Sequence, residues 1–232
     1  MSEALSSFHS LKRRPKSDRA ILVWLFTVVI LIFLMIILGG VTRLTESGLS
    51  IVDWEPIAGV LPPLTEQKWL FEFEKYQLFP EFNSINFAMS LSEFKQIYWF
   101  EWAHRLLGRL IGIVFALPFL WFIVTGRINL KLGIQLGFVL LLGGLQGFLG
   151  WYMVKSGLVD QPDVSAYRLA SHLGLAVVIF GCILWIALGL LQKRSYGPSR
   201  DGLFGLIRVV MPLYTVIIFF TLLSGAFVAG NS

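Results

Sequence analysis

Two histidines lie inside apolar runs, where polar side chains are costly, and they are the residues best suited to chemistry. His104 comes about one turn after the aromatic stretch 98–100, and His172 about one turn after Tyr167. If both runs enter a membrane from the same side, a rise of about 1.5 Å per residue places both imidazoles at similar depth. Ionisable groups inside a membrane usually mark functional sites. Two imidazoles at one level predict the axial ligands of a haem iron.

Other uses of these histidines stay open. A lone intramembrane histidine is often a hydrogen-bonded packing residue. A zinc or copper site would need a third or fourth ligand, and Glu101 is the one residue near this level able to supply it. His9 lies in the polar tail, where we expect a solvated side chain. The single cysteine, Cys182, can form neither an intramolecular disulfide nor a thiolate metal site.

Glu101 shares a helical face with His104. Glu101, His104, Arg105 and Gly108 follow i, i+3, i+4, i+7 spacing. A carboxyl group partly withdrawn from water at an interface can exchange protons near neutral pH. Glu101 is therefore a candidate catalytic residue, with its position alone leaving other roles equally open. An exposed interfacial carboxylate, or a structural partner for Arg105, are the alternatives.

Three arginines are predicted to lie at the level of the histidines: Arg43, Arg105 and Arg168. Guanidinium groups pair carboxylates through two parallel hydrogen bonds, so the three would suit the two propionates of a haem. The alternative is that they extend to the interface to reach water, with Arg168 the most exposed candidate.

The composition indicates which elements must position these residues. Of 232 residues, 56% are hydrophobic and 14% charged, with a mean hydropathy of +0.74, whereas soluble domains are about 25% charged. Five apolar runs approach or exceed the roughly 20 residues that a spanning helix needs: 21–42, 99–125, 132–152, 168–191 and 206–230. We predict an all-α, polytopic transmembrane bundle, with a four-helix haem-binding half followed by a fifth helix.

The charges of the polar segments predict the orientation. The tail 1–20 and the links after the second and fourth runs are basic, whereas 44–98 holds eight acidic residues and three lysines. The positive-inside rule then places the N-terminus in the cytoplasm or organelle matrix, and 44–98 outside. A bacterial plasma membrane and a mitochondrial inner membrane are both open. Because the net charge of +5 is divided among alternate links, no nucleic-acid partner is expected.

Three regions follow from this arrangement. Residues 1–20 form a basic tail, 21–191 the four-helix half with its external segment 44–98, and 192–232 an internal link and the fifth helix. Four prolines and the aromatic stretches 69–73 and 94–100 predict short amphipathic helices that lie at the outer interface and cover the mouth of the bundle. Glycine pairs at 39–40 and 143–144 leave room for helix packing or for a flat ligand.

Several motifs resemble the haem A synthases, membrane enzymes of cytochrome oxidase assembly. They are GGVTRLTESGLS at 39–50, WEP at 54–56, PP at 62–63, EWAHRLLGR at 101–109, the stretch 143–158, YRLASH at 167–172 and SGAFVAG at 224–230. The resemblance covers nearly the whole chain after residue 20. It implies oxidation of haem O to haem A, in which a porphyrin methyl group becomes a formyl group. It maps the haem-holding histidine pair onto His104 and His172, and a glutamate implicated in the chemistry onto Glu101.

The same resemblance implies more than this chain contains. Family members have eight helices in two halves, and the second half binds a haem b that relays electrons. The chain stops at Ser232, after the fifth expected helix, so we expect it to lack that site and to be inactive alone. The expected partners are the lipid membrane, haem O and haem O synthase. A homo-oligomer stays open, and the electron donor is not identified.

Two other functions are also compatible with the sequence. A non-catalytic b-type cytochrome would keep the histidine pair without needing Glu101. A transporter or assembly factor would instead use the histidines to gate protons.

Overall fold

Five long helices make up most of the fold, which a computed structural model describes over residues 15–54, 58–157, 165–192 and 202–231. They are α2 (Pro15–Leu44), α5 (Leu91–Val124), α6 (Leu130–Gly157), α7 (Ala166–Gln192) and α8 (Gly202–Ala229). Within these ranges all regular secondary structure is helical, and each of the five contains a segment long and apolar enough to cross a membrane. The predicted all-α polytopic fold is confirmed.

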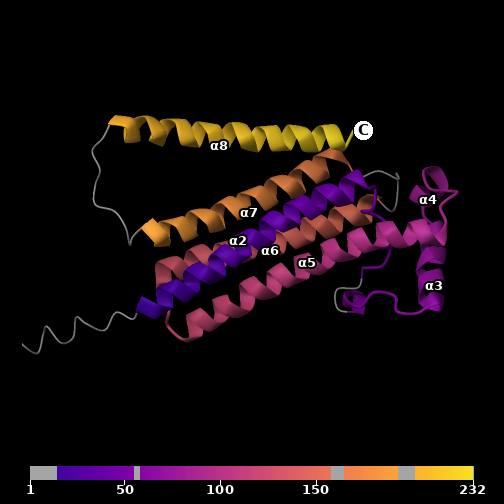
Figure 1. Cartoon of the computed structure of the whole chain (residues 1–232), viewed down its shortest axis with the longest axis horizontal. Coiled ribbons are helices and arrows are strands. Elements are labelled where there is room, and N and C mark those ends of the chain that lie inside the picture. Colours follow the sequence, from indigo (N-terminus) through magenta and orange to yellow (C-terminus); the bar gives the residue numbers. More distant parts are fainter. Residues whose placement is uncertain (1–14, 55–57, 158–164, 193–201, 232) are drawn as a thin grey trace, which may run out of the picture.

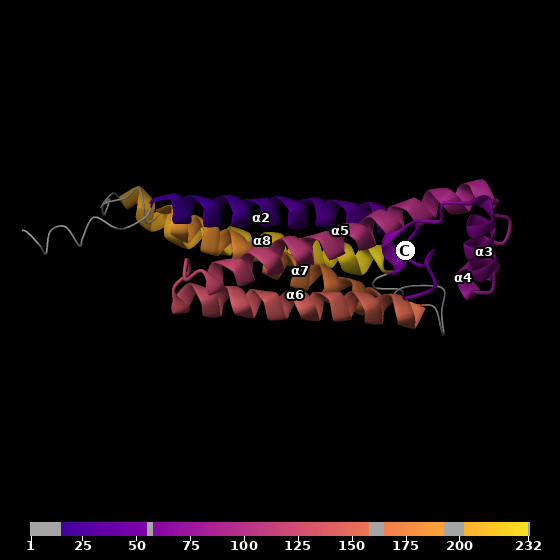
Figure 2. The ribbon, with the colours of Figure 1, turned by 90° about the horizontal axis from the view of Figure 1, so that it is seen from below.

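Four of these helices form a bundle with a definite order of neighbours. Helix α2 packs on α5 and α7, and α6 also packs on α5 and α7. The two helices that carry the histidines, α5 and α7, are therefore diagonally opposite, with α2 and α6 as the other diagonal pair (Figure 1, Figure 2). Helix α8 packs against α7 outside this bundle.

The close-packed core lies at one end of the bundle. Its buried residues come from 21–32 of α2, 115–122 of α5, 132–139 of α6 and 179–187 of α7, with Leu25, Val28 and Leu136 fully buried. On α5 and α7 the buried core residues begin at Phe115 and Ile179, about two turns or more further along each helix than His104 and His172. It rigidifies four helices whose other ends carry the candidate site.

A small cap lies beyond that other end (Figure 1). It contains the turn η1 (Ala58–Val60) and helices α3 (Glu66–Gln77) and α4 (Pro80–Ser84). Helix α3 lies crosswise to the bundle (Figure 1) and packs on the first turns of α5. An aromatic cluster joins them: Trp69, Phe73, Tyr76, Phe94 and Tyr98.

The start of α5 corrects one expectation. The second span was expected from residue 99, with 94–100 in a separate short helix, but α5 begins at Leu91 and is continuous. Ser90 and Glu93 form a reciprocal capping box there, which satisfies two otherwise unpaired amides. Phe94 and Tyr98 then face the cap cluster, so their apolar contacts lie above the bundle.

Candidate haem site

The chain reverses direction at the end of α2 and returns across the mouth of the bundle. The Ser47 amide donates to the Thr42 carbonyl at 3.0 Å and the Glu46 amide to the Arg43 carbonyl at 3.1 Å. These two bonds make a Schellman motif, which requires a left-handed residue just past the helix. Glu46 supplies it, with φ of 51°. The turn delivers residues 47–53 to α5.

Glu101 receives this returning segment. The residue is 2% exposed, and its Oε2 accepts hydrogen bonds from the Ser50 hydroxyl and the Ile51 amide, both at 2.7 Å. Its Oε1 pairs with Arg105 at 2.6 Å from Nη2. The alternative of an exposed carboxylate is therefore wrong, and the partnership with Arg105 is present.

Arg105 completes the same network. Its Nη2 donates to the Ile51 carbonyl at 2.7 Å and its Nη1 to the Asp53 carbonyl at 3.2 Å, while its guanidinium lies over the Trp54 ring. We call Glu101, Arg105 and residues 50–53 the mouth lock. Ser50, Ile51 and Asp53 were missed by sequence reasoning, because a hydrogen bond across about fifty residues leaves no local pattern.

The two histidines each lie against a glycine of a neighbouring helix. A Cβ on Gly39 of α2 would lie 3.2 Å from His104 Nε2, and one on Gly150 of α6 would lie 3.0 Å from His172 Cε1. The imidazoles project from α5 and α7, the diagonal pair of helices. Gly39 was among the glycines expected to leave room for helix packing or for a flat ligand. Gly143 and Gly144 instead face open space.

Gln146 of α6 also reaches His172. Its Nε2 donates to the His172 main-chain carbonyl at 3.0 Å, and its Oε1 is buried without a hydrogen bond in the described part of the chain. Gln146 lies in the stretch 143–158 that carries the family resemblance, but it was not predicted as a site residue. The available signal was an amide in an apolar run, one turn from Gly150 on the same face.

These observations fit a flat, iron-bearing ligand between the histidines. Both imidazoles lie outside the packed core, and each has a glycine beside it where a side chain would intrude. Among the described residues no group of three or more His, Cys, Asp or Glu could hold a metal ion. A zinc or copper site would need such a group, whereas haem iron needs only two axial ligands.

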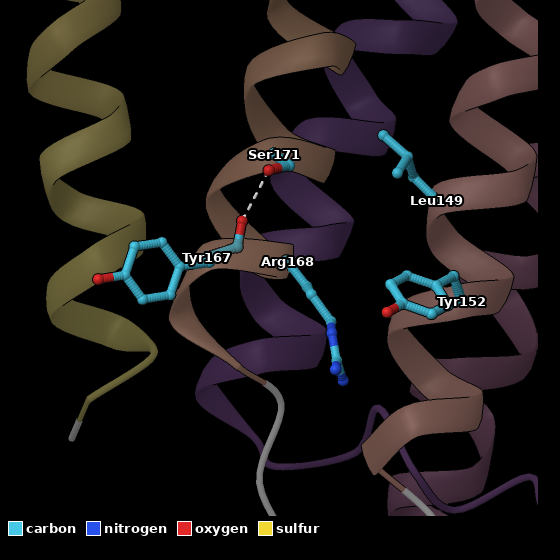
Figure 3. Close-up of a pocket in the computed structure, with 5 residues that line it drawn as sticks. All are labelled: Leu149, Tyr152, Tyr167, Arg168 and Ser171. Atoms are coloured by element: carbon cyan, nitrogen blue, oxygen red, sulfur yellow. Dashed lines mark hydrogen bonds between the residues drawn. The ribbon is translucent and has the colours of Figure 1, made fainter.

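The three predicted arginines have separate contacts. Arg43 donates from Nη2 to the Ala229 carbonyl of α8, and Arg105 belongs to the mouth lock. Arg168 lines a pocket with Leu149, Tyr152, Tyr167 and Ser171, and it points between α7 and α6 with its guanidinium 4.9 Å from the Tyr152 ring centre (Figure 3). Each arginine thus ties one element to another at the mouth end.

The chain is similar to known proteins over most of its length. Curated relatives named heme A synthase include those of Parvibaculum lavamentivorans, 49% identical over 97% of this chain and 64% of the relative. That of Nitrosospira multiformis is 50% identical over 92% of this chain and 60% of the relative, so the chain spans about three fifths of their length. No solved structure matches the chain.

The family assignment covers almost the whole chain. The COX15-CtaA family model, described as cytochrome oxidase assembly protein, matches residues 22–232. With five helices able to cross a membrane, this match identifies an integral membrane protein. The chain therefore belongs to the COX15-CtaA family of cytochrome oxidase assembly proteins.

Proposed function

We propose that this chain is the haem O-binding and oxidising part of a haem A synthase. The observation that carries the proposal is the pair His104 and His172, on diagonal helices with a glycine beside each ring. Relatives named heme A synthase are 49% and 50% identical to this chain in sequence. In the proposed reaction two successive oxygenations, each consuming O₂ and two electrons from a donor, convert a methyl group of the substrate, haem O, into the formyl group of haem A with release of water.

Each site residue has a proposed task. His104 and His172 hold the iron of haem O from its two faces. Glu101 handles a proton or stabilises charge that develops on the reacting carbon, and the mouth lock fixes its carboxylate on the outer side. Arg43 and Arg168 are proposed to meet the propionates, because both lie at the mouth end. Arg105 is the least available for that task, since its donors already serve Glu101 and two carbonyls.

The proposed function also implies a membrane orientation and a set of partners. The N-terminus lies on the cytoplasmic or matrix side of a bacterial plasma membrane or mitochondrial inner membrane. Haem O synthase supplies the substrate, a haem b in the C-terminal half relays electrons from a donor, and a homo-oligomer is compatible with the arrangement. Nucleic acid plays no part.

The proposal is tested by the haems that the chain produces. The chain is expressed with haem O synthase, with and without a co-expressed C-terminal half from a relative, and the extracted haems are separated by chromatography. We expect haem O bound to the chain alone and haem A when the second half is present. Bound haem O that is never converted would favour the b-type cytochrome, and the absence of any bound haem would favour the transporter.

The axial assignment is tested by absorption spectra. His104→Ala and His172→Ala should each abolish the six-coordinate low-spin spectrum, because each removes one of two iron ligands. His9→Ala, in the polar tail, is the matched control and should keep it. A low-spin spectrum that survives either bundle substitution would refute the assignment.

A further inference from the structure

Gln146 makes a contact with His172 that the proposed function does not use. The Gln146 Nε2 that donates to the His172 carbonyl also lies 3.2 Å from ring Nδ1 and 3.3 Å from ring Nε2. Gly150, one turn further along α6, lets the ring approach the helix backbone. One face of α6 therefore holds both the main chain and the ring of His172.

The other atom of the same amide lacks a partner. Gln146 Oε1 is buried, and within the described ranges it is the one buried side-chain oxygen without a hydrogen bond. Leaving a buried acceptor unpaired costs about 1–3 kcal/mol. A donor is therefore expected to reach it in the working state of the site.

The histidine itself is a candidate donor, because its ring nitrogens lie 3.2 and 3.3 Å from the Nε2 of the same amide group. A neutral imidazole carries a proton on one nitrogen and a lone pair on the other. When the lone pair binds a metal, the remaining N–H almost always donates to a carbonyl, a carboxylate or water, which sets the tautomer and the ring orientation. The Gln146 amide already touches both ring nitrogens, so its carbonyl oxygen suits this role.

We propose that Gln146 is the positioning residue of His172: its Nε2 anchors the His172 backbone, and its Oε1 accepts the imidazole N–H that remains when the other ring nitrogen binds haem iron. The iron ligation rests on the proposed function. The Gln146–His172 contact belongs to the chain itself.

A purely structural tie between α6 and α7 would explain the backbone hydrogen bond alone. Two substitutions distinguish this structural role from the proposed positioning role. Gln146→Glu keeps an acceptor oxygen at the same reach but loses the N–H donor, whereas Gln146→Met keeps the length and loses both. A structural tie predicts the same defect for both variants. A positioning role predicts that the two variants shift the reduction potential of the bound haem in opposite directions. Gln135→Met is the matched control, because Gln135 is exposed on the same helix.

The first measurement needs no haem. The chain has three histidines, so a ¹⁵N-histidine spectrum of the detergent-solubilised full chain contains three imidazoles, assigned by the three His→Ala variants. Gln146→Met should change the tautomer-sensitive nitrogen shifts of His172 and leave those of His9 and His104 unchanged. Identical His172 shifts in wild type and in Gln146→Met would overturn the proposal.

The second measurement uses haem O as the probe. Loss of a hydrogen-bonded partner of a metal ligand costs about 10–100-fold in affinity, so Gln146→Met should weaken haem O binding by that factor. A carboxylate acceptor makes the ring a stronger electron donor, so Gln146→Glu should lower the reduction potential of the bound haem, and Gln146→Met should raise it. Gln135→Met should match wild type in both.

The outcomes distinguish this inference from the proposed function. A wild-type chain without a low-spin bis-histidine spectrum would overturn both. A wild-type chain with that spectrum, and Gln146 variants with unchanged potentials, would overturn the role of Gln146 and leave the proposed function standing.

Discussion

Glu101 shows how a single buried carboxylate can hold a segment distant in sequence. Both of its oxygens are occupied, one by Ser50 and Ile51 and the other by Arg105. A buried charge is tolerated only when it is paired and hydrogen-bonded, and the side chains of Arg105 and Glu101 are only 12% and 3% exposed. The pair therefore holds residues 50–53 over the mouth, whatever further chemistry Glu101 performs.

Removing this carboxylate should be costly. Glu101→Leu would leave the Arg105 charge buried without its partner, and we expect a loss of about 3–5 kcal/mol in the free energy of unfolding. Glu101→Gln keeps one acceptor oxygen and should lose about 1–3 kcal/mol. Unfolding in detergent would measure both, with the exposed Glu46→Gln as control. A Glu101→Leu chain as stable as wild type would contradict the mouth lock.

Ser50→Ala separates the lock from proton handling. It removes one donor to Glu101 but keeps the carboxylate and its pairing with Arg105. Haem A formation is measured in the chain co-expressed with the C-terminal half of a relative. If Glu101 acts only by closing the mouth, both Ser50→Ala and Glu101→Gln should reduce haem A formation in proportion to their loss of stability. If Glu101 handles a proton, Ser50→Ala should keep most of the activity that Glu101→Gln loses.

At the scale of the elements, α5 contains a proline in its apolar span and α2 compensates for it. Pro118 has no N–H, so it cannot donate to the carbonyl four residues earlier, that of Val114. Trp24 of α2 donates its indole N–H to that carbonyl at 2.8 Å. Neighbouring helices commonly satisfy carbonyls freed in this way within membranes. The bond joins α2 and α5 at the packed end of the bundle.

A double-mutant cycle tests this compensation. Trp24→Phe should destabilise the chain by about 1–3 kcal/mol, because it leaves the Val114 carbonyl unpaired. In a Pro118→Ala background the new amide can donate to that carbonyl, so Trp24→Phe should cost less. Equal costs in the two backgrounds would show that the indole contributes packing alone.

The cap contains a pH-sensitive group. Tyr76 is fully buried, donates to Glu81 at 3.0 Å and accepts from Asn86 at 2.8 Å. Burial and the Glu81 carboxylate raise the pKa of Tyr76 above its ordinary value of 10.0. Since a raised folded-state pKa favours neutral tyrosine, this contribution to stability is complete below pH 10 and declines as the pH rises beyond it.

Tyr76→Phe should therefore flatten the alkaline loss of cap stability, although it also removes a hydrogen bond at neutral pH. Fluorescence of Trp69, which lies in the same cluster, would follow cap unfolding between pH 9 and pH 12 (a window of about three units around the ordinary tyrosine pKa). Tyr214→Phe, at an exposed position of α8, is the control. An alkaline transition unchanged by Tyr76→Phe would contradict this assignment.

The elements were more predictable than the site. Apolar length alone predicted five spanning helices, because backbone hydrogen bonds must be made internally in lipid. The continuation of α5 to Leu91 was missed, since those turns are stabilised by the capping box and by α3 rather than by lipid. His104 and Glu101 share a face by spacing alone. Ser50 and Gln146 could not be placed, because their contacts depend on how a returning loop and a neighbouring helix meet the site.

At the scale of the whole molecule, α8 is attached to the bundle at the mouth end. The Arg43 guanidinium of α2 donates to the Ala229 carbonyl, which places a positive charge at the C-terminus of a helix, where it is favourable. Tyr167 of α7 meets Phe227 edge-on. Gly230 is buried against Ala166, the first residue of α7. Helix α8 is thus joined to α2 and α7 at the mouth end, near Arg168.

Gly230→Ala should detach this end of α8. A Cβ at residue 230 would lie 2.5 Å from the Ala166 Cα, which is main chain and cannot rotate away, so the ends of α7 and α8 must separate. Overpacking of this kind costs about 1–3 kcal/mol. Hydrogen exchange in nanodiscs should show faster exchange of amides in the last turns of α8, while amides in α2 and α6 stay protected. Gly225→Ala, on the same helix with nothing within 4 Å of the added Cβ, should exchange like wild type. If Gly230→Ala also leaves α8 protected, the attachment at the mouth is not what holds this helix, and its contacts with α7 further along must suffice.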